Sequence, residues 1–391
     1  MQNPAMPREQ ILTNATLVLP DCLLDGTILL RDGLIAEIAP GRSQAPGALD
    51  LEGDYLIPGI IDLHTDNLER QVLPRAGARW PSRSAMLSHD AQTAAAGVTT
   101  VFDALCVGDI NTTGGRHRTF LDGVADLAAL GLAGVMKCDH FLHLRCELPA
   151  PDMDSLLAEV ASHPLLRFAS LMDHVPGVGQ FVDMDRYRAM KRREGMKDGE
   201  IEAHIEAMTA LRTANAARNR AALLETLGGR VPLASHDDWS SAEVARNHAD
   251  GIRVSEFPVN QEAARAAHAH GMDVIVGAPN LVRGGSHSGN VAAIDLVREG
   301  LADCIASDYV PPAMLEAAWR LGLGEGIGLP AAIALVTANP ARMARLEDRG
   351  RLEPGLRGDM VRVRPLPASL APSGAALPMV RSVWLAGERI A

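Results

Sequence analysis

The chain has 391 residues, a formal net charge of −11 and a charged fraction of 22%. This length suits a (β/α)8 barrel with a modest accessory layer. The acidic balance argues against a nucleic-acid-binding surface, so we expect no nucleic-acid partner. Hydrophobic residues make up 47% of the chain but aromatic residues only 3%. The core must therefore consist mainly of Ala, Leu, Val and Ile.

The cysteine content and the apolar runs bear on the cellular compartment. The chain has five cysteines, and none of them forms a Cys-x-x-Cys pair. This pattern indicates neither a disulfide framework nor a thiolate zinc site. Residues 1–9 lack the apolar run of a signal peptide, and no later stretch is long enough to cross a membrane. We therefore expect a cytoplasmic protein that does not bind a membrane.

The first part of the chain has the pattern of short strands. Apolar runs alternate with polar residues, and the pairs Asp25-Gly26 and Asp32-Gly33 are typical of hairpin turns. The predicted strands are residues 11–19, 27–31, 34–39 and 49–57.

From Pro58 onward, short apolar runs alternate with stretches of helical periodicity. Alternation of this kind over about 280 residues predicts an α/β fold with a parallel barrel, the (β/α)8 or TIM barrel. The predicted barrel strands are residues 59–63, 99–102, 134–136, 167–171, 231–234, 254–257, 273–276 and 304–306. The clearest helical stretches are residues 86–96, 119–130, 154–162 and 201–227.

After a last predicted helix over residues 331–337, the pattern returns to short strands at residues 360–364 and 380–385. Both ends of the chain are thus rich in strands. We expect them to pair with each other in one small β-domain beside the barrel.

In a barrel of this type, the reactive residues lie at the carboxyl ends of the strands. Five of the predicted strands are followed by imidazole or carboxylate side chains, which are the ligands of zinc and manganese. A single such residue is more often a surface residue or a helix cap, but their joint occurrence predicts a metal site. The predicted metal ligands are His64, Asp66, Glu147, His174, His236 and Asp308.

Individual roles follow from spacing and chemistry. Because His64 and Asp66 are two residues apart, both side chains lie on one face of a strand and can reach one ion. Glu147 could bridge to a second ion, and a carbamylated Lys137 is the alternative bridge. A metal-bound hydroxide would be the nucleophile. Asp308 is the predicted catalytic residue, because it could accept the proton of that hydroxide and transfer it.

Two regions of the chain resemble the amidohydrolase superfamily. Residues 55–64 (Tyr-Leu-Ile-Pro-Gly-Ile-Ile-Asp-Leu-His) resemble its opening segment, and residues 337–342, 350–355 and 358–361 resemble its closing segment. The resemblance implies a metal-dependent hydrolase barrel over residues 58–343 and a β-sandwich built from residues 1–57 and 344–391. Most members carry His-x-His on the first strand, whereas this chain has His64-Thr65-Asp66.

Further segments are similar to one family within this superfamily, the PhnM diphosphatases of the carbon–phosphorus lyase pathway. The similar segments are residues 64–69, 73–75, 79–81, 140–147, 171–177 and 284–290. The resemblance implies hydrolysis of α-D-ribose 1-methylphosphonate 5-triphosphate to the 5-phosphate and pyrophosphate in phosphonate catabolism. The predicted ligand set itself indicates one or two divalent ions, with zinc preferred and manganese, iron or nickel as alternatives.

Two other functions stay open at this point. The first is hydrolysis of a C–N bond, as in an adenine deaminase or an N-acyl amino-acid deacetylase. The second is a non-catalytic binding protein on the same fold, which would contain little metal. By analogy with other barrels of this kind, a homodimer is also possible.

A triphosphate substrate carries several negative charges and would need cations around it. Arginine suits this role because it forms paired hydrogen bonds with phosphate oxygens. The predicted substrate-binding residues are Arg70, Arg75, Arg79, Arg145, Arg283, Ser286 and His287. The segment 284–289 could turn backbone N–H groups toward an anion, although a plain connection between strand and helix has the same composition. The charged run over residues 186–198 is interpreted as a solvated helix face, with a lid over the phosphates as the alternative. His117, His140 and His143 are candidates without an assigned role.

Overall fold

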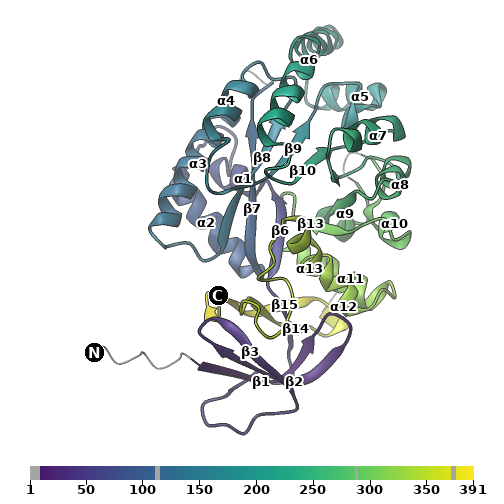
Figure 1. Ribbon diagram of the computed structural model, residues 1–391. Helices are drawn as coiled ribbons and strands as arrows, with labels where there is room; N and C mark the ends of the chain where they lie inside the picture. Colours follow the sequence, from purple (N-terminus) through teal and green to yellow (C-terminus); the bar gives the residue numbers. More distant parts are fainter. Residues whose placement is uncertain (1–8, 111–114, 287–288, 371–375) are drawn as a thin grey trace.

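The computed structural model describes residues 9–110, 115–286, 289–370 and 376–391. Its larger part is a barrel of eight parallel strands that are hydrogen-bonded in chain order (Figure 1). The last strand returns to the first, and a bridge between Thr65 and Asp308 closes the circle. The strands are β6 (Ile60–Thr65), β7 (Val98–Val107), β8 (Asp139–Glu147), β9 (Leu166–Met172), β10 (Leu233–His236), β11 (Val254–Glu256), β12 (Asp273–Gly277) and β13 (Cys304–Ala306). The predicted (β/α)8 barrel is confirmed.

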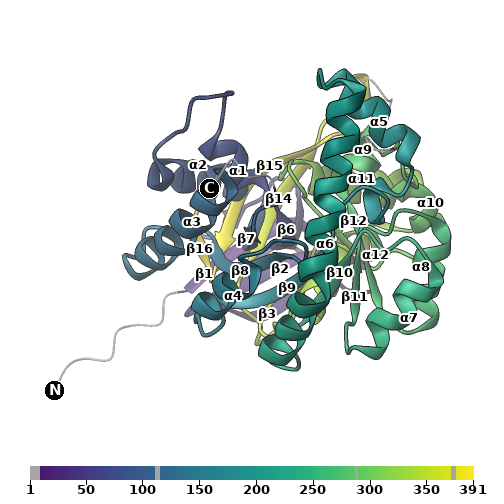
Figure 2. The same ribbon diagram turned by 90° about the horizontal axis from the view of Figure 1, so that it is seen from above.

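Helices surround the barrel, as the view from above shows (Figure 2). They are α1 (Asn67–Val72), α2 (Ser82–Ala95), α3 (Gly115–Leu132), α4 (Met153–Val160), α5 (Met184–Arg193), α6 (Asp198–Leu227), α7 (Ser241–Ala249), α8 (Gln261–Ala269), α9 (Ala278–Arg283), α10 (Ala293–Arg298), α11 (Ala313–Gly324), α12 (Leu329–Ala334) and α13 (Ala338–Met343). Two short 3-10 turns, Gly179–Phe181 and Ala368–Leu370, complete the helical elements. Within the described residues, none of the helices combines the length and apolar character needed to cross a membrane.

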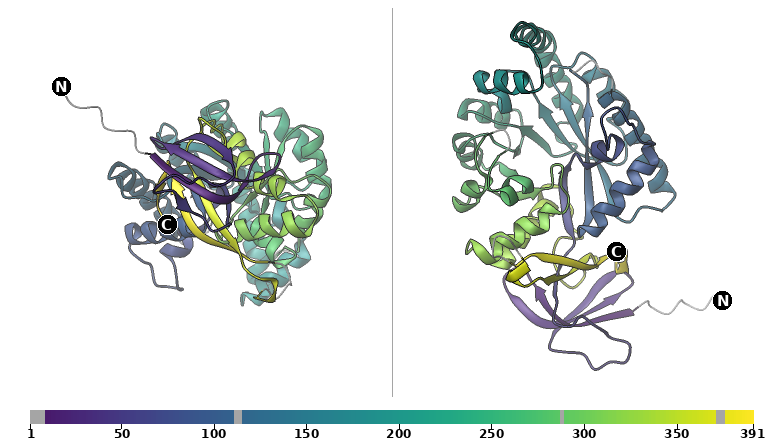
Figure 3. Two further views of the ribbon diagram at one scale, coloured as in Figure 1. Left: turned by 90° about the horizontal axis from the view of Figure 1, so that it is seen from below. Right: turned by 180° about the vertical axis from the view of Figure 1, so that it is seen from behind.

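Both ends of the chain build a second sheet below the barrel (Figures 1 and 3). Its strands are β1 (Glu9–Val18), β2 (Leu23–Arg31), β3 (Leu34–Pro40), β4 (Leu49–Asp50), β5 (Tyr55–Pro58), β14 (Met360–Pro365), β15 (Pro378–Leu385) and β16 (Glu388–Arg389). The order is β16-β15-β14-β5-β1-β2-β3, and β4 pairs with β1. The antiparallel pair β5 and β14 joins the two chain ends. The expected pairing of the ends is thereby confirmed.

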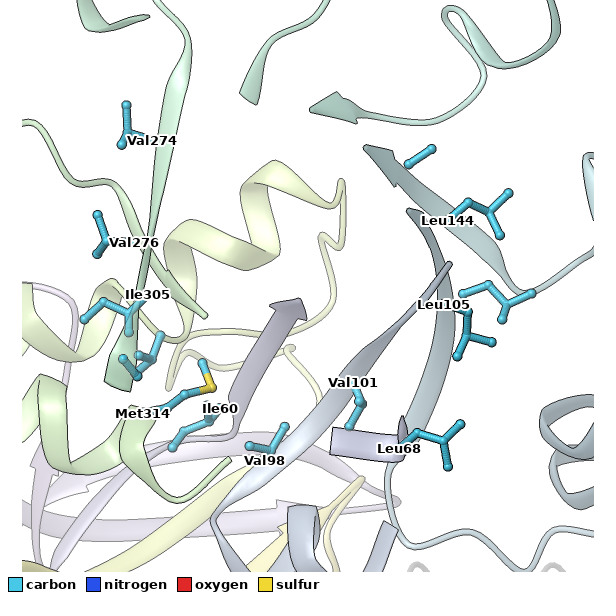
Figure 4. Packing of buried hydrophobic residues seen from close by; sticks show 14 of the residues in the cluster. Ile60, Leu68, Val98, Val101, Leu105, Leu144, Val274, Val276, Ile305 and Met314 are labelled. Atoms are coloured by element: carbon cyan, nitrogen blue, oxygen red, sulfur yellow. The ribbon is translucent and has the colours of Figure 1, made fainter. Parts of the chain in front are cut away.

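Alternation along the barrel strands divides the core into two layers. Val101 on β7 points outward and belongs, with Ile60, Leu105 and Leu144, to the large cluster of buried apolar side chains outside the barrel (Figure 4). Its neighbour Phe102 points inward and belongs to the apolar cluster that fills the barrel. Most of these contacts are aliphatic, as the composition requires. Each fully buried side chain of this size contributes about 1.5–3 kcal/mol to the stability of the fold.

Two predictions from the sequence are wrong in detail. The third barrel strand begins at Asp139 and not at residue 134. Gly134 has a positive φ of 63°, which belongs to a turn, and the backbone N–H groups of Lys137 and Cys138 bond to the side chain of Asp90. Residues 134–138 therefore connect α3 to β8.

The second wrong prediction concerns the pair Asp25-Gly26, which lies inside β2 and pairs with Thr16 and Ala15. A Cβ atom at residue 26 would lie 2.6 Å from the carbonyl oxygen of Ala39, so the glycine permits close approach of two strands. The turn itself is at residues 19–22, where Leu19 N–H donates to the Cys22 carbonyl. The second predicted turn, Asp32-Gly33, is confirmed, with φ values of 52° and 84°.

Gly59 connects the small sheet to the barrel and provides a test of this packing. A Cβ atom at Gly59 would lie 2.3 Å from Thr99 Oγ1. We expect Gly59→Ala to lower the free energy of unfolding by about 1–3 kcal/mol, as overpacking does in other cores. The urea midpoint measures this loss. In Gly131→Ala on α3 the added Cβ meets no atom within 4 Å, so this variant should match or slightly exceed the wild-type midpoint. Equal midpoints for Gly59→Ala and wild type would contradict the packing described here.

Candidate metal centre and substrate cavity

A cavity of about 460 Å³ opens at the carboxyl ends of the barrel strands. This is the end at which barrels of this type place their active sites, and it lies away from the small sheet (Figure 1). Of the residues predicted from the sequence, the structure brings eight to this cavity. They are His64, Asp66, Arg145, His174, His236, Arg283, Ser286 and Asp308.

The backbone bends sharply where three strands enter the cavity. Asp237, Phe257 and Asp308 follow β10, β11 and β13 and have φ values of 58°, 54° and 56°. This left-handed region is uncommon for residues other than glycine, and for a bulky Phe it is an outlier. Such strain persists only where the surrounding structure enforces it, and it concentrates at functional sites.

His64 lies at the end of β6 between two carboxylates. Its Nδ1 donates to Glu256 Oε1 at 3.2 Å, and its Nε2 lies 3.6 Å from Asp66 Oδ1. Burial lowers the pKa of His64, but the charges of Glu256 and Asp66 outweigh burial and raise this pKa to about 10. Ser170 donates to the other oxygen of Glu256 at 2.5 Å. Glu256 therefore fixes the ring of His64, with its Nε2 directed toward Asp66.

His174 follows β9 and is held in the same way by Glu147. Both oxygens of Glu147 are engaged, one by His174 Nδ1 at 2.6 Å and the other by the His174 backbone N–H at 3.0 Å. Burial alone would raise the pKa of Glu147, but His174 lowers it to about 2. This geometry favours a role for Glu147 in orienting His174. Lys137, the alternative bridge, lies before β8 at the opposite end of the barrel and donates to the Ile390 carbonyl at 2.6 Å.

His236 occupies the centre of the donor set. Donor atoms of His64, His236 and Glu256 lie within 4.8 Å of one another, and so do those of His174, His236 and Asp237. Nδ1 of His236 is buried and makes no hydrogen bond among the described residues, although Asp237 Oδ2 lies 2.9 Å away. An unsatisfied imidazole nitrogen surrounded by carboxylates and further imidazoles fits a divalent ion. Two groups that share His236 have room for one or two ions.

Asp66 and Asp308 bring negative charge to the mouth of the barrel. Arg145 Nη1 donates to Asp66 Oδ1 at 2.5 Å. Burial would raise the pKa of Asp66, but Arg145 and His64 bring it well below its usual range. Burial, followed by the nearby charge of Asp66, raises the pKa of Asp308 to about 7. The two carboxylates therefore differ in their affinity for a proton, and Asp308 is the one suited to hold a proton near neutral pH.

Among the described residues, three of the predicted substrate-binding arginines, Arg70, Arg75 and Arg79, do not line this cavity. Arg79 donates to Thr119 and Asp122 on α3, and Arg75 is exposed in the preceding loop. Arg70 donates to the Tyr309 carbonyl at 3.0 Å, next to the cavity wall. His287 lies outside the described residues. For Arg75 and Arg79, sequence proximity to a motif does not correspond to proximity in space.

Several cavity residues were not found from the sequence. Arg116 on α3, and Lys191 and His204 on α5 and α6, add positive or titratable groups to the wall. Helical residues carry no strand-end signal, so only the charged run over residues 186–198 pointed to Lys191. Glu256 ends a correctly predicted strand, and its position at that strand end was a signal that could have identified it.

A parallel barrel with a mouth rich in histidine and carboxylate, joined to a sheet from both chain ends, defines a hydrolase of the amidohydrolase superfamily. Solved structures agree on the fold. Dihydropyrimidinase from Brevibacillus agri has a TM-score of 0.63 and 12% identity over 98% of this chain and 95% of that chain. N-acetylglucosamine-6-phosphate deacetylase from Pasteurella multocida has a TM-score of 0.61 and 11% identity over 98% and 99% of the two chains. No protein-family model matches the chain.

Curated relatives give a finer assignment. The chain is 41% identical over 355 residues to α-D-ribose 1-methylphosphonate 5-triphosphate diphosphatase of Escherichia coli K12, covering 90% of this chain and 94% of that enzyme. Adenine deaminase 2 of Desulfotalea psychrophila is 24% identical over 382 residues, which cover 94% of this chain and 55% of that enzyme. The chain therefore belongs to the family of α-D-ribose 1-methylphosphonate 5-triphosphate diphosphatases.

Glu147→Gln tests whether Glu147 orients a ligand or is itself one. We expect metal affinity to fall roughly 10- to 100-fold, as it does when the partner of a ligating histidine is changed. The number of ions bound at saturating metal should stay the same. Competition with a chelator gives the affinity, and elemental analysis gives the number of ions. Asp173→Asn is the control, because Asp173 pairs with Arg212 at 2.6 Å. If Glu147→Gln bound one metal ion fewer than wild type at saturation, Glu147 would have to be a ligand.

Proposed function

We propose that this protein hydrolyses α-D-ribose 1-methylphosphonate 5-triphosphate to the 5-phosphate and pyrophosphate in phosphonate catabolism. The observation that carries the proposal is the concentration of cations on the cavity wall beside the histidine and carboxylate donors. Arg116, Arg145, Lys191 and Arg283 all line this one cavity. The E. coli relative, whose name states this activity, supports the same substrate.

The cations match a substrate with several negative charges. Arginine presents a rigid fork of N–H donors to phosphate oxygens, while lysine acts as a compact point charge. Arg145 is buried and already held by Asp66, so its guanidinium is oriented before the substrate arrives. Lys191 lines the cavity from α5, and Glu194 Oε2 lies 2.9 Å from its Nζ. We assign Arg145 to the reacting end of the phosphate chain and Lys191 to the outer end.

The donor set would hold one or two divalent ions. Imidazole nitrogens of His64, His174 and His236 suit zinc, with manganese, iron or nickel as alternatives. When bound, such an ion lowers the pKa of water and polarises a phosphoryl oxygen. The carboxylate of Asp308 takes the proton from the attacking water and returns it to the departing pyrophosphate. Glu256 and Glu147 keep the rings of His64 and His174 in one orientation throughout.

Hydrolysis of a C–N bond is the second candidate, because adenine deaminases are among the relatives. A neutral purine or amide gives no role to four cations in the cavity. Incubation of the metal-loaded protein with the ribosyl triphosphate and with adenine separates the two activities. The proposal requires release of pyrophosphate from the triphosphate. Release of ammonia from adenine, without pyrophosphate from the triphosphate, would reject the proposal in favour of the second candidate.

Asp308→Asn tests the proton transfer. The amide cannot accept the proton, so we expect kcat to fall by roughly 10²- to 10⁴-fold. The three imidazoles remain, and most of the metal should stay bound. Initial rates of pyrophosphate release and the metal content of the same sample check both statements. Activity within a factor of two of wild type would remove Asp308 from this role.

Lys191→Met and Arg283→Met test the clamp on the outer phosphates. Loss of either cation should raise KM roughly 10-fold, equivalent to about 1.4 kcal/mol, because binding of the phosphate chain weakens. Arg188→Met is the matched control, since Arg188 lies on α5 with Lys191 but pairs with Glu202 at 2.7 Å. Its steady-state kinetics should equal those of wild type. A KM unchanged in both cavity variants would contradict the clamp.

A further inference from the structure

A continuous network of buried polar side chains lies outside the cavity, between the outer face of the barrel and helices α1 and α2. It consists of Asn67 on α1, His89 and Asp90 on α2, Asp103 on β7 and His140 on β8. All five are buried, and none is more than 8% exposed. Buried groups of this kind are costly unless each donor meets an acceptor. Their protons can therefore be assigned from the hydrogen bonds.

The hydrogen bonds of Asn67 fix the tautomer of His89. Asn67 Nδ2 lies 2.8 Å from His89 Nδ1 and donates to Gln92 Oε1 at 3.0 Å. Gln92 Oε1 also accepts from Gln71 Nε2, which identifies it as the oxygen of its amide. The Asn67 atom that faces Gln92 Oε1 and His89 Nδ1 must therefore be the amide nitrogen. His89 Nδ1 is then the acceptor, and the proton is on Nε2. This Nε2–H donates to Asp103 Oδ1 at 2.7 Å.

The two hydrogen-bond partners of His140 require its ring to carry two protons. Its Nδ1 lies 2.8 Å from Asp103 Oδ2, and its Nε2 lies 3.2 Å from Asp90 Oδ1. Both partners are carboxylates, so both nitrogens donate. Burial lowers the pKa of His140, but Asp103 and Asp90 raise it to about 9. Asp90 also accepts the backbone N–H groups of Lys137 and Cys138. Every side-chain donor of these five residues thus has an acceptor.

Asn67, at one end of this network, directly follows the predicted metal ligand Asp66. Helix α1 has six residues, and a helix of that length is marginal without tertiary contacts. Asp66 occupies its N-cap position, but its side chain makes no capping hydrogen bond and is directed to Arg145. The first turn of α1 is instead fastened through the side chain of Asn67. Thr65, the residue before Asp66, pairs with Asp103 in the adjoining strands.

We propose that Asn67 is a positioning residue, fastened through His89, Asp103 and His140, which holds α1 so that Asp66 stays directed into the cavity. The inference takes Asp66 as a metal ligand, the role predicted from the sequence, and it rests on the proposed function only in that respect. Donor atoms of His89, Asp103 and His140 also lie within 4.8 Å of one another. The completed hydrogen bonds argue that this outer group of His89, Asp103 and His140 holds protons and not a metal ion.

The proton assignment can be tested without any substrate. In the metal-free wild-type protein labelled with ¹⁵N-histidine, His89 should give the spectrum of a neutral ring protonated at Nε2. His140 should give that of a doubly protonated ring at pH 7.5. The variants His89→Gln and His140→Gln assign the signals. A neutral His140, or a proton on His89 Nδ1, would overturn the assignment of the network.

The positioning role is tested by Asn67→Ala against Val72→Ala, a variant of a buried apolar residue on the same helix. Asn67→Ala should weaken metal binding roughly 10-fold or more, as loss of an outer partner does. Val72→Ala should keep wild-type metal affinity even if it lowers the melting temperature equally. Equal affinities in wild type and Asn67→Ala would overturn the positioning role.

Metal counts separate the remaining outcomes. Asp103→Asn should bind as many ions at saturation as wild type, and loss of an equivalent would identify the cluster as a metal site and overturn the proposal. Because these readouts are metal affinity and ring protonation, they stand if the protein fails to release pyrophosphate. That failure would count against the proposed function alone.

Discussion

The seam at which the barrel closes is the constraint on which the site depends. There, Asp308 N–H donates to the His64 carbonyl at 3.0 Å, and Asp66 N–H donates to the Asp308 carbonyl at 2.5 Å. These backbone bonds join the end of the first barrel strand to the end of the last. Just below them, the buried carboxylate of Asp62 accepts the Ser307 N–H at 3.0 Å. Residues more than 240 positions apart are thereby held side by side, and any loosening of the seam would separate the ligand candidates from the carboxylate of Asp308.

The site is layered outward from this seam. Glu256 and Glu147 lie behind the imidazoles of His64 and His174 and fix their orientation. The strand ends therefore supply rigid donor atoms, which a metal centre requires. Helices α3, α5 and α9 add Arg116, Lys191 and Arg283 to the wall of the same cavity. Arg145 is the exception, since it comes from strand β8 and ties the two layers together through Asp66.

Strand-end residues were predictable because one physical rule covers them. Parallel strands of a closed barrel direct their carboxyl ends to a common mouth, so the amino-acid sequence alone was enough to group His64, His174, His236 and Asp308. That rule does not reach Arg116 or His204, whose positions depend on how helices pack. It also does not separate a ligand from its partner. The carboxylate of Glu147 ends a strand like the others, yet both of its oxygens bond to His174. The wrong boundary of β8 has a similar cause, because an apolar run before a strand looks like its beginning.

Anomalous diffraction from a crystal of the metal-loaded protein, recorded at the absorption edge of the bound metal, would locate the ions themselves. We expect one or two peaks at bonding distance from the imidazole nitrogens of His64, His174 and His236, at the mouth of the barrel. We expect none at His89, Asp103 and His140. An absence of peaks at the mouth, or a peak confined to His89, Asp103 and His140, would contradict a metal centre at the mouth.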